Sequence, residues 1–410
     1  MKKRILFIHQ HYFPEMAGTA RRTKELAEGL YIKGHICTVL TSYPRIFRSI
    51  PGYKASDFEI INGVRVFRLK THFEVKINVL FRMISYLIFF IKSALWMYKY
   101  RKKFDLAISI APLASGMCGA LAQKYFKLPH HFDVPDILPD LGISAGMIRN
   151  KLLIKVLYNI ERWVYDNSTT ISAITEGQVK NIEKKGVNSD KIYLFPDWVD
   201  VEFFLINAKK HNQLIHDQIN KHNRYKIISF IGNIGALQGV ESFLDLARLL
   251  NDDAQLKYKF LFIGDGIMLD TLQKRVKKEQ ILNVEFIGRV PRELVPSYMN
   301  QSDILVANYL NNPYMDICIP GKTYEYLVSN RPILIGSRGE SAKLVQKFNA
   351  GIAVEPMNPH EMKKAIYTIL QNPKLFEIDL EKFISLYKID AIIEDYNNMI
   401  IKKYSLNQEK

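Results

Sequence analysis

The stretch "IISFIGNIGALQGVESF", residues 227–243, decides the fold. It begins as an apolar run, passes through Gly232, Gly235 and Gly239, and ends in a segment with helical spacing of its apolar residues. A strand that enters a helix through a glycine-rich loop is typical of a parallel α/β unit. The glycine spacing matches neither G-x-G-x-x-G nor a P-loop. A loop that binds a diphosphate with its backbone N–H groups and a plain strand-to-helix turn both stay open.

Similar units repeat on both sides of this stretch. The first half contains the short apolar runs "ILFI", "ICTVLT", "LAISIA", "TTISAIT" and "KIYLFP", and the second half contains "KFLFIGDG", "VEFIG", "DILVANY", "PILIG" and "GIAVE". Segments with helical spacing separate them, which predicts right-handed crossovers and parallel sheets. Because 410 residues exceed what one core usually organises, the sequence predicts two doubly wound α/β domains of Rossmann type.

Changes in composition suggest the domain boundaries. We expect an N-terminal domain over residues 1–205, a polar linker over 206–225, and a second Rossmann-like domain over 226–375. Residues 376–410 read as a helical tail that packs back on the N-terminal domain. In such tandem domains, ligands are expected at the carboxyl ends of the strands and in the cleft between the domains.

The bulk composition restricts the partners and the compartment. A formal net charge of +16 and a pI near 9.4 favour an anionic partner, which can be nucleic acid, an acidic membrane surface or a phosphorylated substrate. Cys37, Cys118 and Cys318 have no metal-ligand or disulfide spacing. The first apolar run is too short for a signal peptide. We therefore expect a cytoplasmic protein, with peripheral contact to the inner face of the cell membrane left open.

The segment 70–103 is the one candidate for membrane contact. It holds eight basic residues and a single acid, Glu74, and its helical part places Arg82, Ser85, Lys92 and Lys99 along a narrow stripe. Such a helix can lie on an anionic membrane. It can equally be a buried helix of the first domain that shows one polar edge. Its longest uncharged run is too short to span a bilayer.

Two loops of the second half carry polar residues at the ends of predicted strands or at a helix start. In "IPGKTYEYL", Lys322 and Glu325 lie three residues apart, where a lysine can neutralise a phosphate and a carboxylate can bind ribose hydroxyls. In "FIGDGIMLD", the backbone of Gly264, Asp265 and Gly266 is accessible and can form hydrogen bonds with the edge of a nucleobase. The alternatives are a surface ion pair for Lys322 and Glu325 and a tight turn for residues 264–266.

Two loops of the first half have similar properties. In "HQHYFPEMAGTARR", a strand is followed by an anion-binding candidate. In "HFDVPDILPDLG", three aspartates among prolines can hold sugar hydroxyls or simply form turns. The candidates are Gly18, Thr19, Arg21, Arg22, Asp133, Asp136 and Asp140. His9 and His11 alternate along a strand, but no carboxylate stands at a ligand spacing, so no metal site is predicted.

In this order, the segments resemble family-4 retaining glycosyltransferases, which have the GT-B architecture of two facing Rossmann-like domains with an interdomain cleft. The resemblance runs from Ile5 to about residue 370 and rests on "HQHYFPEMAGTARRTKELAEGL", "PDILPD", "PDWVD", "GNIGALQGVES", "FIGDG" and "PGKTYEYL". The chain looks most like bacterial enzymes of O-antigen and capsular polysaccharide synthesis that transfer N-acetyl sugars such as N-acetyl-L-fucosamine.

The resemblance implies transfer with retention from a UDP-sugar, of N-acetylhexosamine type, to a lipid-linked glycan. The catalytic candidates are Asp136 and Lys322. Donor binding is assigned to Gly18, Gly232, Asn233, Gly235, Gln238, Gly264, Asp265, Gly266, Lys322 and Glu325. The acceptor side is assigned to Thr19, Arg21, Arg22 and Asp133. No cofactor or metal is expected, because no Asp-x-Asp motif closes a predicted strand.

Some positions depart from the family pattern. Asn233 and Gln238 stand where many members carry Arg and Lys, and Ile317 stands where many carry a second Glu eight residues before Glu325. Two other functions stay open. A UDP-sugar epimerase shares the architecture, and a non-catalytic nucleic-acid-binding protein would explain the charge, although the chain lacks zinc or helix-turn-helix motifs and no nucleic-acid partner is expected.

Overall fold

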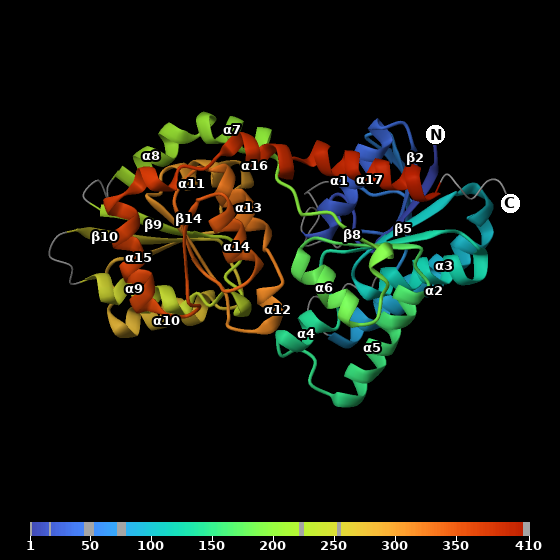
Figure 1. Ribbon diagram of the computed structural model, residues 1–410, viewed down its shortest axis with the longest axis horizontal. Coiled ribbons are helices and arrows are strands. Elements are labelled where there is room, and N and C mark those ends of the chain that lie inside the picture. The colour runs from blue at the N-terminus through green and yellow to red at the C-terminus, as the bar shows by residue number, and fades with distance from the viewer. Residues whose placement is uncertain are drawn as a thin grey trace. The chain divides into compact units, whose positions relative to one another are not determined.

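The computed structural model describes residues 2–15, 18–44, 53–71, 79–220, 225–251 and 256–404. It divides into two compact units. Unit 1 comprises Met1–Pro196 and Ile389–Lys410, and unit 2 comprises Asp197–Lys388. Figure 1 shows each unit as a sheet with helices on both faces. The predicted fold class, two Rossmann-like α/β domains, is confirmed.

The described part of unit 1 forms an eight-stranded sheet in the order β3-β4-β2-β1-β5-β6-β7-β8. Neighbouring strands are parallel except for the edge pair β3 and β4, which is antiparallel, so the sheet is mixed where a purely parallel one was predicted. Ile5 pairs with Cys37 on one side and with Leu106 on the other. The strands are β1 Arg4–Ile8, β2 Ile36–Ser42, β3 Phe58–Ile61, β4 Val64–Leu69, β5 Leu106–Ile110, β6 His130–Val134, β7 Thr170–Ala173 and β8 Ile192–Leu194.

Helices cover both faces of this sheet. On one face, α3 packs against both α2 and α5. On the opposite face, α1 and α17 contact each other (Figure 1). Strand β5 is buried along its whole length, as expected for a central parallel strand covered twice. The helices are α1 Thr19–Ile32, α2 Val79–Tyr100, α3 Leu113–Phe126, α4 Asp140–Ser144, α5 Lys151–Asp166, α6 Glu176–Lys184 and α17 Ile389–Tyr404.

The described part of unit 2 forms a six-stranded parallel sheet in the order β11-β10-β9-β12-β13-β14. Its main core lies between the sheet and α9, α10 and α15. The strands are β9 Tyr225–Ile231, β10 Lys257–Ile263, β11 Val284–Gly288, β12 Ile304–Asn308, β13 Ile333–Gly336 and β14 Gly351–Val354. The helices are α7 Val201–Lys210, α8 Asn212–Asn220, α9 Glu241–Asn251, α10 Leu269–Glu279, α11 Val295–Asn300, α12 Pro313–Asp316, α13 Gly321–Val328, α14 Glu340–Lys347, α15 Pro359–Gln371 and α16 Leu380–Tyr387.

The predicted linker 206–225 differs from what the structure shows. Through residue 220 it is part of α7 and α8, which pack on α11 within unit 2. Ser297 donates a hydrogen bond to the carbonyl of Asn207 at 3.0 Å, and Tyr298 donates to Gln218 at 2.9 Å. A few buried apolar residues, among them Ile215, anchor this largely polar segment. The boundary between the units therefore falls after Pro196, and residues 221–224 lie outside the described part of the chain.

The predicted C-terminal tail is shared between the units. Helix α16 belongs to unit 2, whereas α17 belongs to unit 1 and packs on α1. The chain thus returns to its first unit only at Ile389.

Helix α2 is only partly the buried helix proposed as one alternative for segment 70–103, and contact with a membrane, the other alternative, stays a prediction. It buries Phe89, Ser93 and Met97, and its exposed side carries apolar residues. Ser85 accepts a hydrogen bond from Gln10 at 3.0 Å, and Lys92 donates to the carbonyl of Lys70 at 2.7 Å. Glu74 and the side chain of Arg82 lie outside what the structure describes. No helix in the described ranges is long and apolar enough to cross a membrane.

Candidate functional site

The strand order of unit 2 marks one place in its sheet as a ligand site. From β9 the chain continues to β10 on one side, while β12 lies on the other side, so the order reverses between β9 and β12. Ligands of open α/β sheets bind outside the carboxyl ends of the strands at such a switch point. The loop that begins at Gly232 follows β9, and Tyr309 follows β12. The glycine-rich stretch that predicted the fold therefore lies at the expected position for a ligand.

Lys322, in the first turn of α13, extends to this place. Its ammonium nitrogen lies 4.0 Å from the ring centroid of Phe230 and 5.8 Å from that of Tyr309. The Lys322 side chain also covers Gly232, where an added Cβ would be 3.8 Å from Nζ. The nitrogen is buried, and no described residue accepts a hydrogen bond from it. A buried ammonium group without an acceptor is costly, so this nitrogen is suited to receive an anionic ligand.

The surroundings of Lys322 also alter its proton affinity. Burial lowers the pKa of the Lys322 ammonium to about 7, and the negative charge of nearby Glu325 opposes this shift. Two aromatic rings stabilise the cation only in part. A negative charge bound beside Lys322 would raise its pKa again, because it favours the ammonium form.

Helix α13 is held in place by a tyrosine. The hydroxyl of Tyr326 accepts a hydrogen bond from the N–H of Ile231 at 2.9 Å and donates to its carbonyl at 3.1 Å. This contact fixes α13 beside the end of β9. Because Pro320 at the N-cap supplies no side-chain acceptor, the first N–H groups of the helix have no side-chain cap. The helix start adds a partial positive charge to that of Lys322.

Two glycines predicted to contact the base have a clear packing role. An added Cβ on Gly264 would lie 1.9 Å from the carbonyl oxygen of Gly232, and one on Gly266 would lie 2.3 Å from that of Ile234. Ile234 N–H donates to the Asp265 carbonyl at 2.9 Å. The loops after β9 and β10 thus pack backbone against backbone, which only glycine permits. Asp265 itself is exposed at the tip of the second loop.

Gly239 is held by a residue that sequence reasoning missed. Asn308, the last residue of β12, donates to the Gly239 carbonyl at 2.9 Å and to the Ser242 hydroxyl at 2.8 Å. It also accepts from the N–H of Met357 at 3.2 Å. Gly239 has φ +50, and an added Cβ would be 2.6 Å from the Asn308 amide nitrogen. A polar residue that closes an otherwise apolar buried strand was the signal in the sequence.

The remaining predicted donor residues of unit 2 lie around the same loop. Gln238 has a buried side-chain oxygen to which no described residue donates. Asn233 is exposed and sits over Gly235, where an added Cβ would lie 2.6 Å from its amide nitrogen. Glu325 is half-buried on the same helix as Lys322. The structure therefore groups Gly232, Gln238, Lys322 and Glu325 near the switch point, together with Phe230 and Tyr309, which were not predicted.

The predicted residues of unit 1 divide into surface and core positions. Gly18, assigned to the donor, precedes α1 with φ +55 and is exposed. Thr19 begins the helix and accepts a hydrogen bond from Thr23 through its carbonyl at 2.7 Å. Arg21 lies 3.6 Å from Glu25 one turn later, so the two form a half-buried ion pair of the helix.

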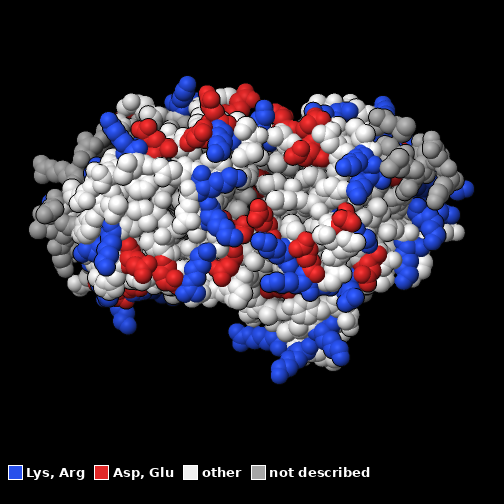
Figure 2. Space-filling view, viewed as in Figure 1, with Lys and Arg blue, Asp and Glu red and all other residues white. Residues whose placement is uncertain are grey.

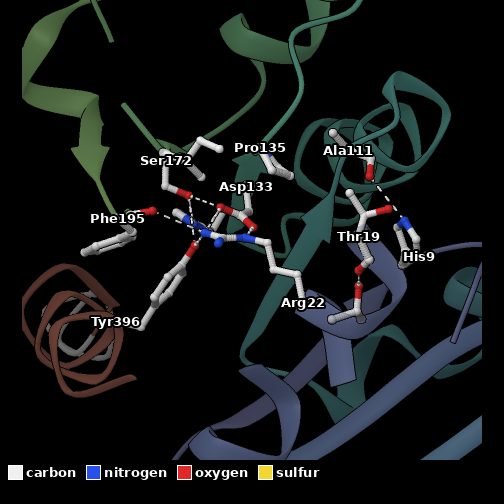
Figure 3. A network of polar contacts seen from close by, with 12 residues as sticks. His9, Thr19, Arg22, Ala111, Asp133, Pro135, Ser172, Phe195 and Tyr396 are labelled. Carbon is white, nitrogen blue, oxygen red and sulfur yellow. Dashed lines mark hydrogen bonds and ion pairs between the residues drawn. The ribbon is translucent and has the colours of Figure 1, made fainter. Parts of the chain in front are cut away.

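Arg22 and Asp133, predicted to face the acceptor, are instead buried together (Figure 3). Arg22 Nε donates to Asp133 Oδ2 at 2.6 Å, and Ser172 and Tyr396 each donate to Oδ1 at 2.6 Å. Burial would raise the pKa of Asp133, but the Arg22 charge and these hydrogen bonds lower it. The network joins β6, α1, β7 and α17. Asp133 has no exposed surface, so it could contact an acceptor only if these contacts changed.

His9 closes β1 at the switch point of unit 1. Its Nε2 lies 3.2 Å from the Ala111 carbonyl beyond β5, a contact drawn in Figure 3. Burial lowers the pKa of His9 to about 4, so the ring is neutral near pH 7. Among the residues that the structure describes, no group of three His, Cys, Asp or Glu side chains could hold a metal ion.

Asp136 is exposed and borders a small, largely enclosed space in unit 1. Phe132 and Tyr165 contribute to its lining, as does the buried carboxylate of Glu161. Burial raises the pKa of Glu161 against the opposing charge of Lys185. Asp136 is thus accessible to a ligand, unlike Asp133. Asp140, the third aspartate of this segment, is tied to Lys185 at 2.9 Å.

Comparison with known proteins identifies the family. The model of the glycosyl transferase 4-like domain matches residues 17–198, and that of the glycosyl transferases group 1 matches residues 212–383. WcaI of Escherichia coli (strain K12), a provisionally named colanic acid biosynthesis glycosyl transferase, is 24% identical over 383 residues, which cover 90% of this chain and 93% of WcaI. Both family models describe glycosyl transfer, so the epimerase alternative is not favoured.

Solved structures agree in fold. The chain is similar to the sucrose-phosphate synthase of Thermosynechococcus elongatus, with a TM-score of 0.77, 16% identity, and coverage of 98% of this chain and 100% of that one. It is also similar to Anabaena HepE in complex with UDP-glucose, with a TM-score of 0.71, 13% identity and the same coverage. Since the two family models together match residues 17–198 and 212–383, the chain belongs to the group 1, family-4-like glycosyltransferases with the GT-B fold.

Proposed function

We propose that the protein transfers a sugar, with retention of configuration, from a UDP-sugar of N-acetylhexosamine type to a lipid-linked glycan in the synthesis of a cell-surface polysaccharide. The observation that carries the donor half is the buried Lys322 nitrogen, which lacks a hydrogen-bond acceptor beside Gly232. Anabaena HepE, which is similar in fold, binds UDP-glucose, and WcaI is named for colanic acid biosynthesis. Both are consistent with this donor and this product.

In the proposed mechanism, unit 2 stabilises the leaving diphosphate. As the bond between the sugar and the diphosphate breaks, negative charge grows on the departing phosphate oxygen. Lys322, the free N–H groups at the start of α13 and the loop of Gly232 to Gly239 would receive that charge. This arrangement supplies the positive charge that Arg and Lys give many family members in the loop that here contains Asn233 and Gln238. We therefore expect the reaction to proceed without a metal ion.

Other residues would position the substrates. Glu325 is proposed to accept hydrogen bonds from the ribose, while the backbone near Asp265 would contact the base. On the other side of the reaction, Asp136 is the accessible carboxylate of its loop and is proposed to lie beside the reacting sugar. The acceptor would be bound in the membrane, which places the enzyme at the inner face of the cell membrane.

A nucleotide screen tests this function. UDP and UDP-N-acetylhexosamines should raise the melting temperature, because a ligand that binds only the folded state stabilises it, while GDP and ADP serve as controls. Incubation of UDP-sugar with and without membrane lipid extract then separates transfer from epimerisation, because an epimerase would convert the donor without an acceptor. The absence of a shift with every nucleotide sugar would refute the proposal.

A further inference from the structure

Met357 contacts the loop that is proposed to bind the donor. Its sulfur accepts a hydrogen bond from the Asn308 amide at 2.9 Å, and a Cβ added to Gly239 would lie 2.5 Å from that sulfur. Asn308 is the residue that holds Gly239 and Ser242 by hydrogen bonds at the end of this loop. The sulfur therefore packs against both the loop and the side chain that fixes it.

The backbone of Met357 is held in an uncommon conformation. The N–H of Asn358 donates to the Glu355 carbonyl at 3.3 Å, which closes a turn over residues 355–358, and Met357 has φ +59 at its third position. A positive φ there favours glycine or asparagine over methionine. Met357 N–H donates to Asn308 Oδ1 at 3.2 Å, and Asn358 caps α15 through its side chain. These contacts keep Met357 beside Asn308.

Met357 is also accessible to dissolved reagents. Its exposed fraction is 37%, and of the methionines whose side chains the structure describes only Met147, at 69%, is more exposed. Met299 and Met362, by contrast, are fully buried. An uncharged oxidant such as hydrogen peroxide is not guided by the basic and acidic side chains that Figure 2 shows over both units. Exposure therefore decides which methionines it reaches first.

Oxidation changes this contact in size and polarity. The sulfur lone pair attacks one oxygen of hydrogen peroxide, the O–O bond breaks, and the products are methionine sulfoxide and water. The sulfur loses two electrons and the peroxide gains them. A sulfoxide accepts hydrogen bonds through its oxygen and no longer through its sulfur. If that oxygen points to solvent, the Asn308 contact is lost, and if it keeps the contact, it must fit between Asn308 and Gly239, where the packing leaves no space.

We propose that Met357 is an oxidation site that controls the donor loop, and that its sulfoxide weakens binding of the donor diphosphate. The inference rests on the proposed function, because it takes the loop of Gly232 to Gly239 as the site of the diphosphate. Methionine sulfoxide reductase reverses the change. The sequence did not predict this role, since Met357 stands in a short connection that has no motif of its own.

Peroxide titration of the full chain tests the site. After removal of the oxidant with catalase, peptide mass spectrometry locates the oxidised methionines, and the shift in melting temperature with UDP gives the affinity. Met357 and Met147 should be oxidised before the buried methionines. The affinity for UDP should fall about tenfold, which is the effect of losing one or two hydrogen bonds. Methionine sulfoxide reductase should restore it, whereas dithiothreitol should not, because it reverses only the oxidation of cysteine.

Three single variants separate Met357 from the other exposed methionine. Met357→Leu cannot form a sulfoxide, so its affinity for UDP should be the same before and after treatment, whatever its starting value. Met147→Leu, in unit 1, should lose affinity on treatment as the wild type does. Met357→Gln places a polar amide where the sulfoxide would lie, and it should bind UDP about tenfold more weakly than the wild type without any oxidant.

Full oxidation of Met357 with unchanged affinity for UDP would overturn the proposal, as would an equal loss of affinity in Met357→Leu. Recovery with dithiothreitol would assign the effect to a cysteine instead. The proposed function has a separate outcome, since it fails if UDP does not stabilise the untreated protein. In that case the melting temperature without nucleotide still tests the site. Oxidation should lower it in the wild type and not in Met357→Leu, because the Asn308 contacts are disturbed, and equal values would contradict the proposal.

Discussion

The ammonium nitrogen of Lys322 lies 4.0 Å from the ring centroid of Phe230, and no described residue accepts a hydrogen bond from it. Replacement by Ala should therefore reduce turnover roughly a hundredfold, as expected when a group that stabilises developing charge is removed. The same change should leave the melting temperature equal or higher, because it removes a buried ammonium without an acceptor. UDP release gives the rate, and Lys343→Ala, at an exposed ion pair of the same unit, is the control. Unchanged turnover would remove Lys322 from the mechanism.

The lowered pKa of Lys322 predicts a pH-dependent stability. Its pKa is about 7 in the folded protein against 10.5 for an ordinary lysine, so between these values the unfolded chain binds more protons. The free energy of unfolding should then rise with pH through this window, relative to Lys322→Met, and run parallel to the variant below pH 7. Urea unfolding at a series of pH values measures both curves. Parallel curves throughout would show that the lysine is charged in the folded state.

The backbone contact between the loops after β9 and β10 predicts a steep cost at Gly264. Gly264→Ala brings a Cβ to 1.9 Å from the Gly232 carbonyl oxygen, so the loops must separate. We expect a loss of about 2–4 kcal/mol in the free energy of unfolding and weaker stabilisation by UDP. Gly288→Ala is the matched control, since Gly288 also has positive φ but nothing lies within 4 Å of the added Cβ. That control should cost about 1 kcal/mol. Equal losses would show that the close contact is relaxed in solution.

The buried network of unit 1 predicts that loss of the Tyr396 hydroxyl costs more stability than loss of a surface contact of the same helix. Tyr396→Phe deprives Asp133 of a donor at 2.6 Å and should cost about 1–3 kcal/mol in urea unfolding. Lys33, just after α1, forms an exposed ion pair with Glu394 of α17. Lys33→Ala removes this pair and should cost less stability than Tyr396→Phe, because solvent screens an exposed pair. Equal losses of stability in the two variants would show that the Tyr396 hydrogen bond contributes no more than the surface ion pair.

The proposed charge stabilisation predicts insensitivity to chelators. Treatment with EDTA followed by removal of divalent cations should leave UDP release unchanged, since Lys322 and the start of α13 would carry the role of a metal ion. Readdition of Mg²⁺ or Mn²⁺ serves as the control. Loss of activity with EDTA and its recovery with one of these ions would contradict the mechanism.

The sequence predicted the fold because the strands read as apolar runs between helical segments. It also named the glycine-rich loop and Lys322, which the structure brings together, while their binding of a donor stays a prediction. It missed Phe230 and Tyr309, because an aromatic residue in or beside a buried strand looks like any core residue. Their contact with Lys322 arises from the strand order β9-β12.

The structure differs from the expectation where distant residues or widely spaced apolar residues decide the contacts. Arg22 and Asp133 stood in loops typical of ligand binding, yet they pair with each other across 111 positions. Segment 206–225 looked like a linker because apolar residues are few, but widely spaced ones such as Ile215 are enough to pack α7 and α8. Neither fact can be read from local composition.

Helix α17 has a consequence for the order in which the protein is made. Asp133 is translated early, but its donor Tyr396 follows 263 positions later, after the whole of unit 2. Until Tyr396 has been translated, the Asp133 carboxylate of the first unit therefore lacks one of its hydrogen bonds. Unit 2 is continuous and can complete its own core before that, so the half of the protein that is translated first is the last to be finished.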